Sequence, residues 1–410
     1  MANLKVLYVF FYGSGKIDSG VEKKIVSQVT AMKAAGAEVD LISVNPYIEK
    51  DAIVNDFYRI YALDKPLVYN SHFYTLRSRK RIFEKIDFLL TDLYLKYDRI
   101  FLRYPLSDYN LLKLVLRYGE KIIIEHNSME EVELKSMYHE MRKKTKFHFS
   151  PGFLFWYFDR IMYLFFSEKL FGKRVLSKVR GGVAVTNEIC AYEKKRVKSY
   201  RCEVGTNGID YLSVPIRKFD KKDFKRNPIR GFLLSGFTAS WHGVERIVDG
   251  LESYKGKQDF ELYFIGDFSA EQKEHIEKSA VLNRVKLIAH TTADKLTALL
   301  EVCDFAFGTM ALHKKNLTEA VPLKVRESLA RGFPLVKAYA DPDLDDKVEL
   351  KPFILNFPDD ESSVDFNIIA DFISKLNETD ELANKIRMES SKYIDVKLKA
   401  DKLLHLIMSI

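Results

Sequence analysis

The chain has 410 residues, of which 47% are hydrophobic and 30% are charged, and this length and composition fit two globular domains. Disordered, collagen-like and fibrous proteins are excluded by the same composition. The sequence has no basic leader and no uncharged apolar stretch of about 18 residues, so we expect neither a signal peptide nor a membrane-spanning helix. Three cysteines without metal-ligand spacing fit a reducing compartment, and the expected location is the cytoplasm.

The positive charge is concentrated in one segment. The formal net charge is +8, and residues 141–180 alone carry ten basic and two acidic side chains. Aromatic and aliphatic residues fill 153–158 and 161–166, among the basic groups. This pattern favours a helix that lies on an anionic membrane surface through 142–180, at the inner face of the membrane. A long core helix with solvated basic ends explains the same pattern. We expect no nucleic-acid partner, because no recognised reader motif accompanies the segment.

Short β-branched or aromatic runs alternate with helical periodicity along the chain. In the first half, strands are predicted near 4–11, 38–43, 98–103, 121–125 and 182–186, with helices near 20–35, 78–95, 107–118 and 153–178. In the second half, strands are predicted near 231–236, 260–265, 284–289, 304–307 and 334–337, with helices between them and a further helix from about 380. Alternation of this kind is typical of parallel sheets covered by helices on both faces.

The predicted fold class is therefore α/β, with two doubly wound, Rossmann-like domains that face each other across a cleft. We place the N-terminal domain at 1–208 and the C-terminal domain at 209–390, with a helix near 390–410 that packs back on the first domain. In such sheets ligands bind at the carboxyl ends of the strands. This pattern predicts where a ligand binds, but it does not identify the chemistry.

A glycine-containing loop follows the first predicted strand. Residues 13–16 read Gly-Ser-Gly-Lys, but position 10 is Phe10 rather than glycine and no Ser or Thr follows Lys16, so a Walker A phosphate loop is excluded. The next helix is predicted to start at Gly20. Backbone N–H groups at that start suit a phosphate or a sugar hydroxyl, although many such loops are only tight turns.

The sharpest local pattern in the second half is a pair of acids around a predicted helix start. Pro322 is placed as the first residue of this helix and Gly332 as its C-terminal cap. Glu319 then lies in the preceding loop, and Glu327 about one turn inside the helix. If this helix start faces a ligand, its N–H groups and Lys324 favour a phosphate, and the two carboxylates can accept hydrogen bonds from sugar hydroxyls. An amphipathic helix with exposed acids is the alternative.

Several segments, in the right order over most of the chain, together resemble the retaining glycosyltransferases of family 4, which have the GT-B fold. The acidic pair with its intervening proline is the family's hallmark. Further matches are the opening loop, helix and strand around 19–39, the passage at 207–210 and the turn at 266–267. His126 ends the fourth predicted strand, where the family often has a histidine beside the donor sugar.

The segment 236–243 departs from the family pattern. It keeps the spacing of the family's glycines, but Phe237 replaces an arginine and His242 a lysine, and these two cations usually grip the donor diphosphate. A Trp-His-Gly variant occurs within the family, and we place this chain in that subgroup. Lys324 and the helix dipole are then the expected substitutes for the missing charge.

The resemblance implies a role for each candidate residue. Glu319, in contact with the donor sugar, and His126, near that sugar, are the catalytic candidates. The donor-binding candidates are Gly20, His242, Thr291, Lys324 and Glu327. Among them, Glu327 is expected at the ribose, Lys324 at the phosphate and Thr291 near the nucleobase.

The resemblance also implies the chemistry and the partners. Enzymes of this kind use no protein nucleophile, and the leaving diphosphate helps to deprotonate the acceptor hydroxyl. We expect a nucleotide-sugar donor, a glycan or lipid-linked acceptor of bacterial surface polysaccharide synthesis, no cofactor and no metal. The residues Asp341-Pro342-Asp343 resemble a metal-binding Asp-x-Asp motif, but their place after a strand favours a turn. Two alternatives are a GT-B-shaped binding subunit without turnover and a sugar-nucleotide epimerase.

Overall fold

The computed structural model describes residues 4–11, 20–67, 74–135, 154–155, 157–218, 228–236, 238–376 and 381–410. The chain divides into two compact units. The first unit is Met1–Thr206 together with Lys399–Ile410, and the second unit is Asn207–Leu398. The segment that returns to the first unit therefore begins at Lys399, within the predicted C-terminal helix.

The first unit is built on an eight-stranded sheet. Its strands run in the order β3-β4-β2-β1-β5-β6-β7-β8, and all neighbours are parallel except β3 and β4. The strands are β1 (Lys5–Phe11), β2 (Glu38–Asn45), β3 (Ala52–Ile53), β4 (Tyr58–Ala62), β5 (Arg99–Arg103), β6 (Ile122–His126), β7 (Gly181–Ala184) and β8 (Cys202–Val204). The helices are α1 (Gly20–Ala34), α2 (Tyr74–Leu93), α3 (Tyr109–Tyr118), α6 (Tyr163–Leu176), α7 (Asn187–Arg196) and α14 (Val396–Ser409).

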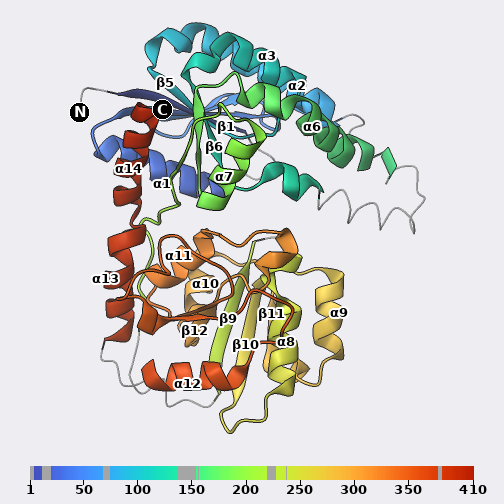
Figure 1. The fold of residues 1–410 in the computed structure, drawn as a ribbon, viewed down its shortest axis with the longest axis vertical. Coiled ribbons are helices and arrows are strands. Elements are labelled where there is room, and N and C mark those ends of the chain that lie inside the picture. The colour runs from blue at the N-terminus through green and yellow to red at the C-terminus, as the bar shows by residue number, and fades with distance from the viewer. Residues whose placement is uncertain are drawn as a thin grey trace. The chain divides into compact units, whose positions relative to one another are not determined.

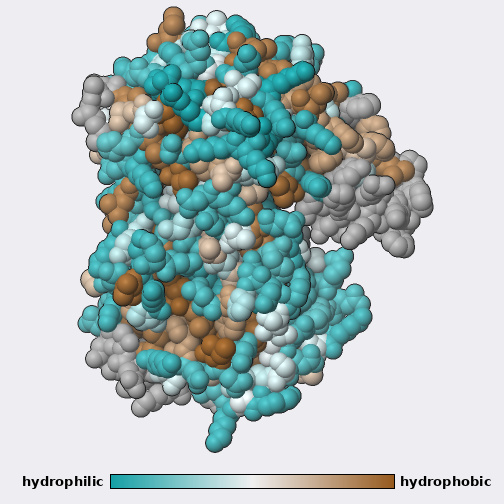
Figure 2. Space-filling model, in the orientation of Figure 1, coloured by the Kyte–Doolittle hydropathy of each residue, from teal (hydrophilic) through white to brown (hydrophobic). Residues whose placement is uncertain are grey.

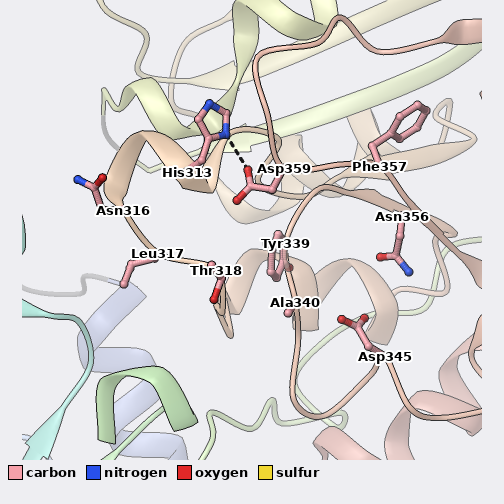
Figure 3. Close-up of a pocket in the computed structure, with 10 residues that line it drawn as sticks. All are labelled: His313, Asn316, Leu317, Thr318, Tyr339, Ala340, Asp345, Asn356, Phe357 and Asp359. Carbon is pink, nitrogen blue, oxygen red and sulfur yellow. Dashed lines mark hydrogen bonds and ion pairs between the residues drawn. The ribbon is translucent and has the colours of Figure 1, made fainter. Parts of the chain in front are cut away.

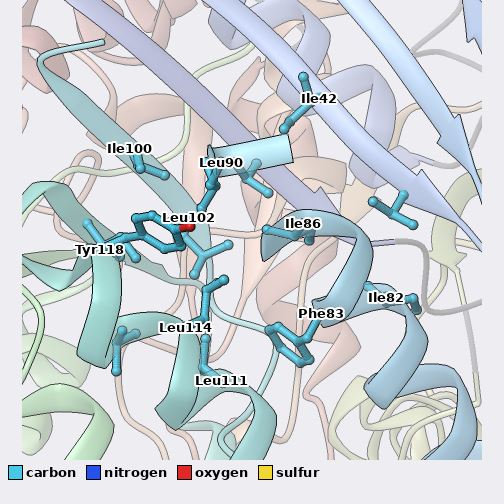
Figure 4. Packing of buried hydrophobic residues seen from close by; sticks show 14 of the residues in the cluster. Ile42, Ile82, Phe83, Ile86, Leu90, Ile100, Leu102, Leu111, Leu114 and Tyr118 are labelled. Carbon is cyan, nitrogen blue, oxygen red and sulfur yellow. The ribbon is translucent and has the colours of Figure 1, made fainter. Parts of the chain in front are cut away.

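Helices cover both faces of this sheet, with α2 and α3 on one side of it and α1 and α7 on the other (Figure 1). Residues 6–10 of β1 are all buried, because a strand covered on both faces needs a continuous apolar run rather than an alternating one. On the α2–α3 side, Leu102 of β5 packs with Phe83, Ile86 and Leu111 in one hydrophobic core (Figure 4). This core holds the carboxyl ends of the central strands in place.

The second unit is built on a six-stranded parallel sheet in the order β11-β10-β9-β12-β13-β14. The strands are β9 (Ile229–Ser235), β10 (Phe260–Gly266), β11 (Val285–Ile288), β12 (Phe305–Phe307), β13 (Leu335–Lys337) and β14 (Ile354–Asn356). The helices are α8 (Val244–Ser253), α9 (Ala270–Lys278), α10 (Ala293–Leu300), α11 (Leu323–Ala330), α12 (Phe366–Leu376) and α13 (Leu382–Ile394). In chain order this is the 3-2-1-4-5-6 arrangement of a Rossmann sheet, whose strand order reverses between β9 and β12. The predicted α/β class is confirmed.

Several predicted elements differ in detail from the structure. The helix predicted at 153–178 includes a π-helical turn at Phe158–Met162 before α6, and the single helix predicted from about 380 is two helices, α13 and α14. The break lies at Asp395, whose backbone is extended and bridges to Ile209. Strands β3, β4, β8 and β14 were not predicted, and β3, β8 and β14 each have only two or three residues and lie at a sheet edge. None of the helices in the described ranges combines the length and the apolar character needed to cross a bilayer.

The core of the first unit gives a stability prediction. Leu102 is 1% exposed, so Leu102→Ala should lower the free energy of unfolding by about 2–5 kcal/mol, through lost burial and a cavity. Urea denaturation followed by circular dichroism measures this change. Leu95→Ala is the matched control, because Leu95 is 86% exposed and should change stability by less than about 0.5 kcal/mol.

Candidate functional site

Two predicted donor-binding residues meet at the point where the strand order of the second unit reverses. The Nζ atom of Lys324 lies 3.1 Å from the carbonyl oxygen of Leu234, near the carboxyl end of β9. The same Nζ atom lies 3.0 Å from Nδ1 of His242. Open α/β sheets bind ligands at this reversal, so the contact lies where a ligand is expected.

A glycine fixes the position of His242. Gly243 follows it with φ +72°, a backbone conformation that glycine adopts without strain. A Cβ atom at Gly243 would also lie 2.8 Å from Cβ of Met310, which comes after β12. The backbone N–H of Ala311 donates to the carbonyl of Trp241 at 3.1 Å, which ties the Trp-His-Gly segment to the chain after β12. Phe237, the other departure from the family pattern, lies outside the described residues, as do residues 13–16.

Helix α11 carries Lys324 and Glu327. It begins at Leu323, so Pro322 is the N-cap residue rather than the first helical residue, and no side chain caps this start. The prediction that Gly332 ends the helix agrees with its φ of +85° and with the bond from its N–H to the carbonyl of Leu329 at 2.9 Å. The uncapped start leaves backbone N–H groups that favour an anion.

A buried ion-pair cluster fixes α11 to the chain after β13. Arg326 is fully buried, and its Nη2 atom lies 2.9 Å from Oδ1 of Asp341 and 3.0 Å from Oδ2 of Asp343. The N–H of Asp343 donates to Oδ1 of Asp341 at 3.0 Å, as in a turn. Both carboxylates of the Asp-Pro-Asp segment therefore bind an arginine, in agreement with its interpretation as a turn.

Lys324 is unusual because its ammonium group is desolvated. Burial lowers the pKa of Lys324 to about 7. None of the carboxylates in the described part of the chain forms an ion pair with it, and its neighbours are a carbonyl and an imidazole. A bound phosphate would supply the missing negative charge and raise this pKa.

The two members of the acidic pair are held differently. Glu319 is half-buried in an extended segment that bridges to Ala340, where the N–H of Ala320 donates to the Ala340 carbonyl at 3.0 Å. Glu327 is half-buried in α11, and Arg331 donates to its Oε1 atom from Nε at 3.0 Å and from Nη2 at 2.8 Å. Arg331 was not predicted, although its spacing of four residues on a helix is the spacing of such pairs.

The other predicted residues belong to other elements of the fold. Thr291 is half-buried between β11 and α10, and Gly20 is exposed at the first residue of α1, where an added Cβ would meet nothing within 4 Å. Gly20 and His126 belong to the first unit, whereas His242, Thr291 and the α11 residues belong to the second. The roles of Thr291 and Gly20, like those of the other predicted site residues, stay predictions.

His126 is fully buried at the end of β6 and contacts protein groups at both ring nitrogens. Its Nε2 atom lies 2.9 Å from the Tyr200 hydroxyl and its Nδ1 atom 3.5 Å from a carboxylate oxygen of Glu130. One ligand atom each from His126, Glu130 and Glu193 lie within 4.8 Å of one another, a spacing that could hold a metal ion. Arg196 already pairs with Glu193 at 3.0 Å, so a buried hydrogen-bonded network explains these residues without a metal. For His126 to contact a donor sugar, its hydrogen bonds within this network would have to break.

A pocket of about 700 Å³ lies at the carboxyl ends of β13 and β14 (Figure 3). It is lined by His313, Asn316, Leu317, Thr318, Tyr339, Ala340, Asp345, Asn356, Phe357 and Asp359. None of these is a predicted site residue. Thr318 lines the pocket, whereas the next residue, Glu319, does not. Glu319 nevertheless adjoins the lining, because its segment bridges to Ala340.

Comparison with known proteins identifies the fold. Sucrose-phosphate synthase from Thermosynechococcus elongatus matches with a TM-score of 0.70 at 14% identity, over 99% of each chain. Anabaena HepE, solved with UDP and glucose, matches with a TM-score of 0.60 at 15% identity over 100% of each chain. WaaG, a glycosyltransferase of lipopolysaccharide biosynthesis, matches with a TM-score of 0.58 at 13% identity, over 98% of this chain and 99% of its own. No protein-family model and no curated protein sequence matches. The expected GT-B fold is confirmed, and at these identities the likeness extends to the fold alone.

The environment of Lys324 predicts a pH-dependent stability. The pKa of Lys324 is lower in the folded chain than the usual value near 10.4. Between about pH 7 and pH 10 this lysine is therefore protonated in the unfolded chain but largely neutral in the folded chain. Lys324→Met should therefore raise the free energy of unfolding by roughly 1–3 kcal/mol at pH 7, and this gain should shrink as the pH rises towards 10. Urea titrations at pH 7.0 and 9.5 measure it.

Lys337→Met is the control for that prediction. Lys337 is fully buried and burial also lowers its pKa, but its Nζ atom pairs with Asp345 at 2.6 Å. Its removal leaves that carboxylate without its cationic partner and should therefore destabilise the chain. A loss of stability at pH 7 in Lys324→Met would contradict the desolvated state of that ammonium group.

Proposed function

We propose that this protein is a retaining glycosyltransferase of the family 4 type that moves a sugar from a nucleotide-sugar donor to a glycan or lipid-linked acceptor. The observation that carries the proposal is the contact of Lys324 with His242 at the strand reversal. Lys324 lies on the same helix as Glu327. HepE, solved with UDP-glucose, shares the fold and supports a nucleotide-sugar donor. The lipopolysaccharide outer core galactosyltransferase WaaB also shares it and supports a role in bacterial surface polysaccharide synthesis. The Trp-His-Gly sequence supports the variant subgroup.

The donor diphosphate is assigned to the start of α11. Lys324 would donate to a phosphate oxygen, and its charge would be restored by that oxygen. When the Lys324 ammonium donates to Nδ1 of a neutral His242, the hydrogen of that imidazole resides on Nε2, which can donate to a second oxygen. Two donors and a helix start then replace the family's usual arginine and lysine.

The acidic pair is assigned to the donor's hydroxyl groups. Arg331 binds only Oε1 of Glu327 in the described contacts, so Arg331 orients the carboxylate and leaves Oε2 for the two ribose hydroxyls. Glu319 would accept hydrogen bonds from the transferred sugar. Thr291 would lie near the nucleobase, Gly20 at the donor phosphate or sugar, and His126 beside the sugar.

The proposed reaction needs no protein nucleophile. The bond between the anomeric carbon and the diphosphate oxygen breaks, the acceptor oxygen attacks on the same face, and the acceptor proton passes to the leaving diphosphate. Positive charge at Lys324 and at the helix start would stabilise the developing diphosphate charge, which is electrostatic preorganisation. Because these groups supply positive charge, the proposal needs no metal.

Replacement of Glu319 tests the function. Glu319→Gln keeps the shape but removes the charge, and turnover of the nucleotide-sugar donor should fall by about 10²–10³-fold, because an interaction strengthened in the transition state is lost. Release of nucleoside diphosphate measures turnover, and it should survive excess chelator. Glu277→Gln, at an exposed position of α9, should leave turnover unchanged.

The alternatives give different outcomes in the same assay. Nucleotide binding without turnover on any donor or acceptor would favour a non-catalytic binding subunit. A sugar-nucleotide epimer formed without acceptor would identify an epimerase. Loss of turnover with chelator, restored by Mg²⁺ or Mn²⁺, would contradict the metal-independent mechanism.

We further propose that α6 lies on the inner face of an anionic membrane. Phe158, Phe166 and Leu170 of this helical segment are 56%, 50% and 61% exposed, and apolar atoms gather over α6 in Figure 2. Exposed basic residues follow on the same helix, Lys169 and Lys173 among them. An apolar ridge beside cations fits acyl chains and lipid phosphates together. Residues 142–153 of the predicted membrane segment lie outside the described residues.

Liposome flotation tests this surface. Binding should need anionic lipid, weaken as salt is raised, and fall at least fivefold when Phe166 and Leu170 are both replaced by Ser, because apolar insertion and charge act together. Leu95→Ser is the control, since Leu95 is exposed elsewhere on the first unit. Equal binding to neutral vesicles, or none to either kind, would assign the helix to a purely structural role.

A further inference from the structure

A second cavity lies in the first unit, and none of the predicted donor residues lines it. It has a volume of about 270 Å³ and lies at the carboxyl ends of β1 and β5, where the strand order of that sheet reverses. It is lined by Phe11, Tyr74, Thr75, Ser78, Arg79, Ile82, Phe83, Pro105, Leu106, Arg160 and Leu164. Ligands bind preferentially where the strand order of a doubly wound sheet reverses. The polar groups in this lining therefore indicate which kind of ligand the cavity could bind.

The hydroxyl group of Thr75 is buried in this lining without a partner. Thr75 is 6% exposed, and its N–H donates to Oδ2 of Asp159 at 2.9 Å. Its Oγ1 atom is buried and has no hydrogen-bond partner among the described residues. A buried hydroxyl without a partner destabilises a folded chain, and a ligand that bonds to it would remove that cost.

The backbone beside the cavity is strained and clamped. Leu106 has φ +65°, which is costly for a residue with a side chain. Arg79 holds this conformation, because its guanidinium donates to the carbonyls of Pro105 at 2.6 Å and Leu106 at 2.7 Å and to Asp108 at 2.6 Å. Arg79 therefore has a structural role, and its charge is balanced by Asp108.

Arg160 is the cation placed to meet a ligand. Its guanidinium lies over the ring of Tyr74 at 3.9 Å and is 3.6 Å from Asp159, a longer separation than that between Arg79 and Asp108. The carboxylate of Asp159 also accepts from the Thr75 N–H, so its charge is shared. The remaining lining is mainly apolar, as at Ile82, Phe83 and Leu164. One cation, one hydroxyl and an apolar wall suit a hydrocarbon ligand that ends in a phosphate group.

We propose that this cavity binds the part of a lipid-linked acceptor where the hydrocarbon chain joins its phosphate. Arg160 and Leu164 belong to the helical segment that carries the exposed ridge of Phe158, Phe166 and Leu170, so cavity and ridge are continuous along one element. The inference rests on the proposed transferase function and narrows its acceptor to the lipid-linked class. The phosphate faces Arg160, the first carbons contact Leu164 and Phe83, and Thr75 donates to an ester or phosphate oxygen.

Calorimetric titration with farnesyl monophosphate tests this site. The full chain should bind it with a negative heat-capacity change, the mark of apolar burial. Farnesol and inorganic phosphate, each carrying half of the proposed ligand, should bind at least tenfold more weakly. Arg160→Gln should weaken the binding of farnesyl monophosphate but leave the affinity for farnesol unchanged.

Thr75→Val separates a binding role from a structural one. Valine has the same shape and removes only the unpartnered hydroxyl, so the melting temperature should stay the same or rise while farnesyl monophosphate binds about three- to tenfold more weakly. Thr91→Val is the matched control, because Thr91 is an exposed threonine on the same helix. Equal affinities in the two variants would overturn the role of Thr75.

The outcomes also distinguish this inference from the proposed function. Donor turnover without any binding of farnesyl monophosphate would overturn the lipid site and leave the transferase proposal standing. Binding without turnover of any donor would support the site and overturn the transferase. Equal affinity for farnesol and its phosphate would overturn the assignment of Arg160.

Discussion

The arrangement of the candidate site depends on the buried cluster of Arg326 with Asp341 and Asp343. Helix α11 has only eight residues, and a helix that short is not stable on its own. Arg326 ties it to the chain after β13, and that chain also pairs with the segment of Glu319 through Ala340. A buried ion pair contributes more to a defined geometry than to net stability. Here it holds both acids in a fixed relation to Lys324.

The family that this chain resembles has an arginine and a lysine where this sequence has Phe237 and His242. The cation near this segment is instead the desolvated Lys324. The Trp-His-Gly segment supplies an imidazole, and Lys324 supplies an ammonium group whose pKa has fallen to about 7. A site of this kind holds its full positive charge only when an anion is present. Under the proposed function, protonation of Lys324 and binding of the donor diphosphate are therefore coupled, and each strengthens the other.

The sequence predicts the regular elements well, because long apolar runs and helical periodicity set both sheets. Pro322 and Gly332 could likewise be placed next to the two ends of α11, since proline and glycine have few alternatives there. The desolvation of Lys324 and the network around His126 could not be predicted, because both depend on residues that are distant in sequence. His126, for example, contacts Tyr200, and Lys324 contacts Leu234. Such pairings are decided by tertiary packing.

The return of α14 to the first unit has a consequence for biosynthesis. A Cβ at Gly181 would lie 2.5 Å from Ile410, and one at Gly205 would lie 3.5 Å from Leu406, so α14 packs directly against the β7–β8 end of the sheet. The ribosome must make the whole second unit before this helix exists. The domain that is translated first is thus completed last, and until then its outer strands have an uncovered apolar face that a chaperone could shield.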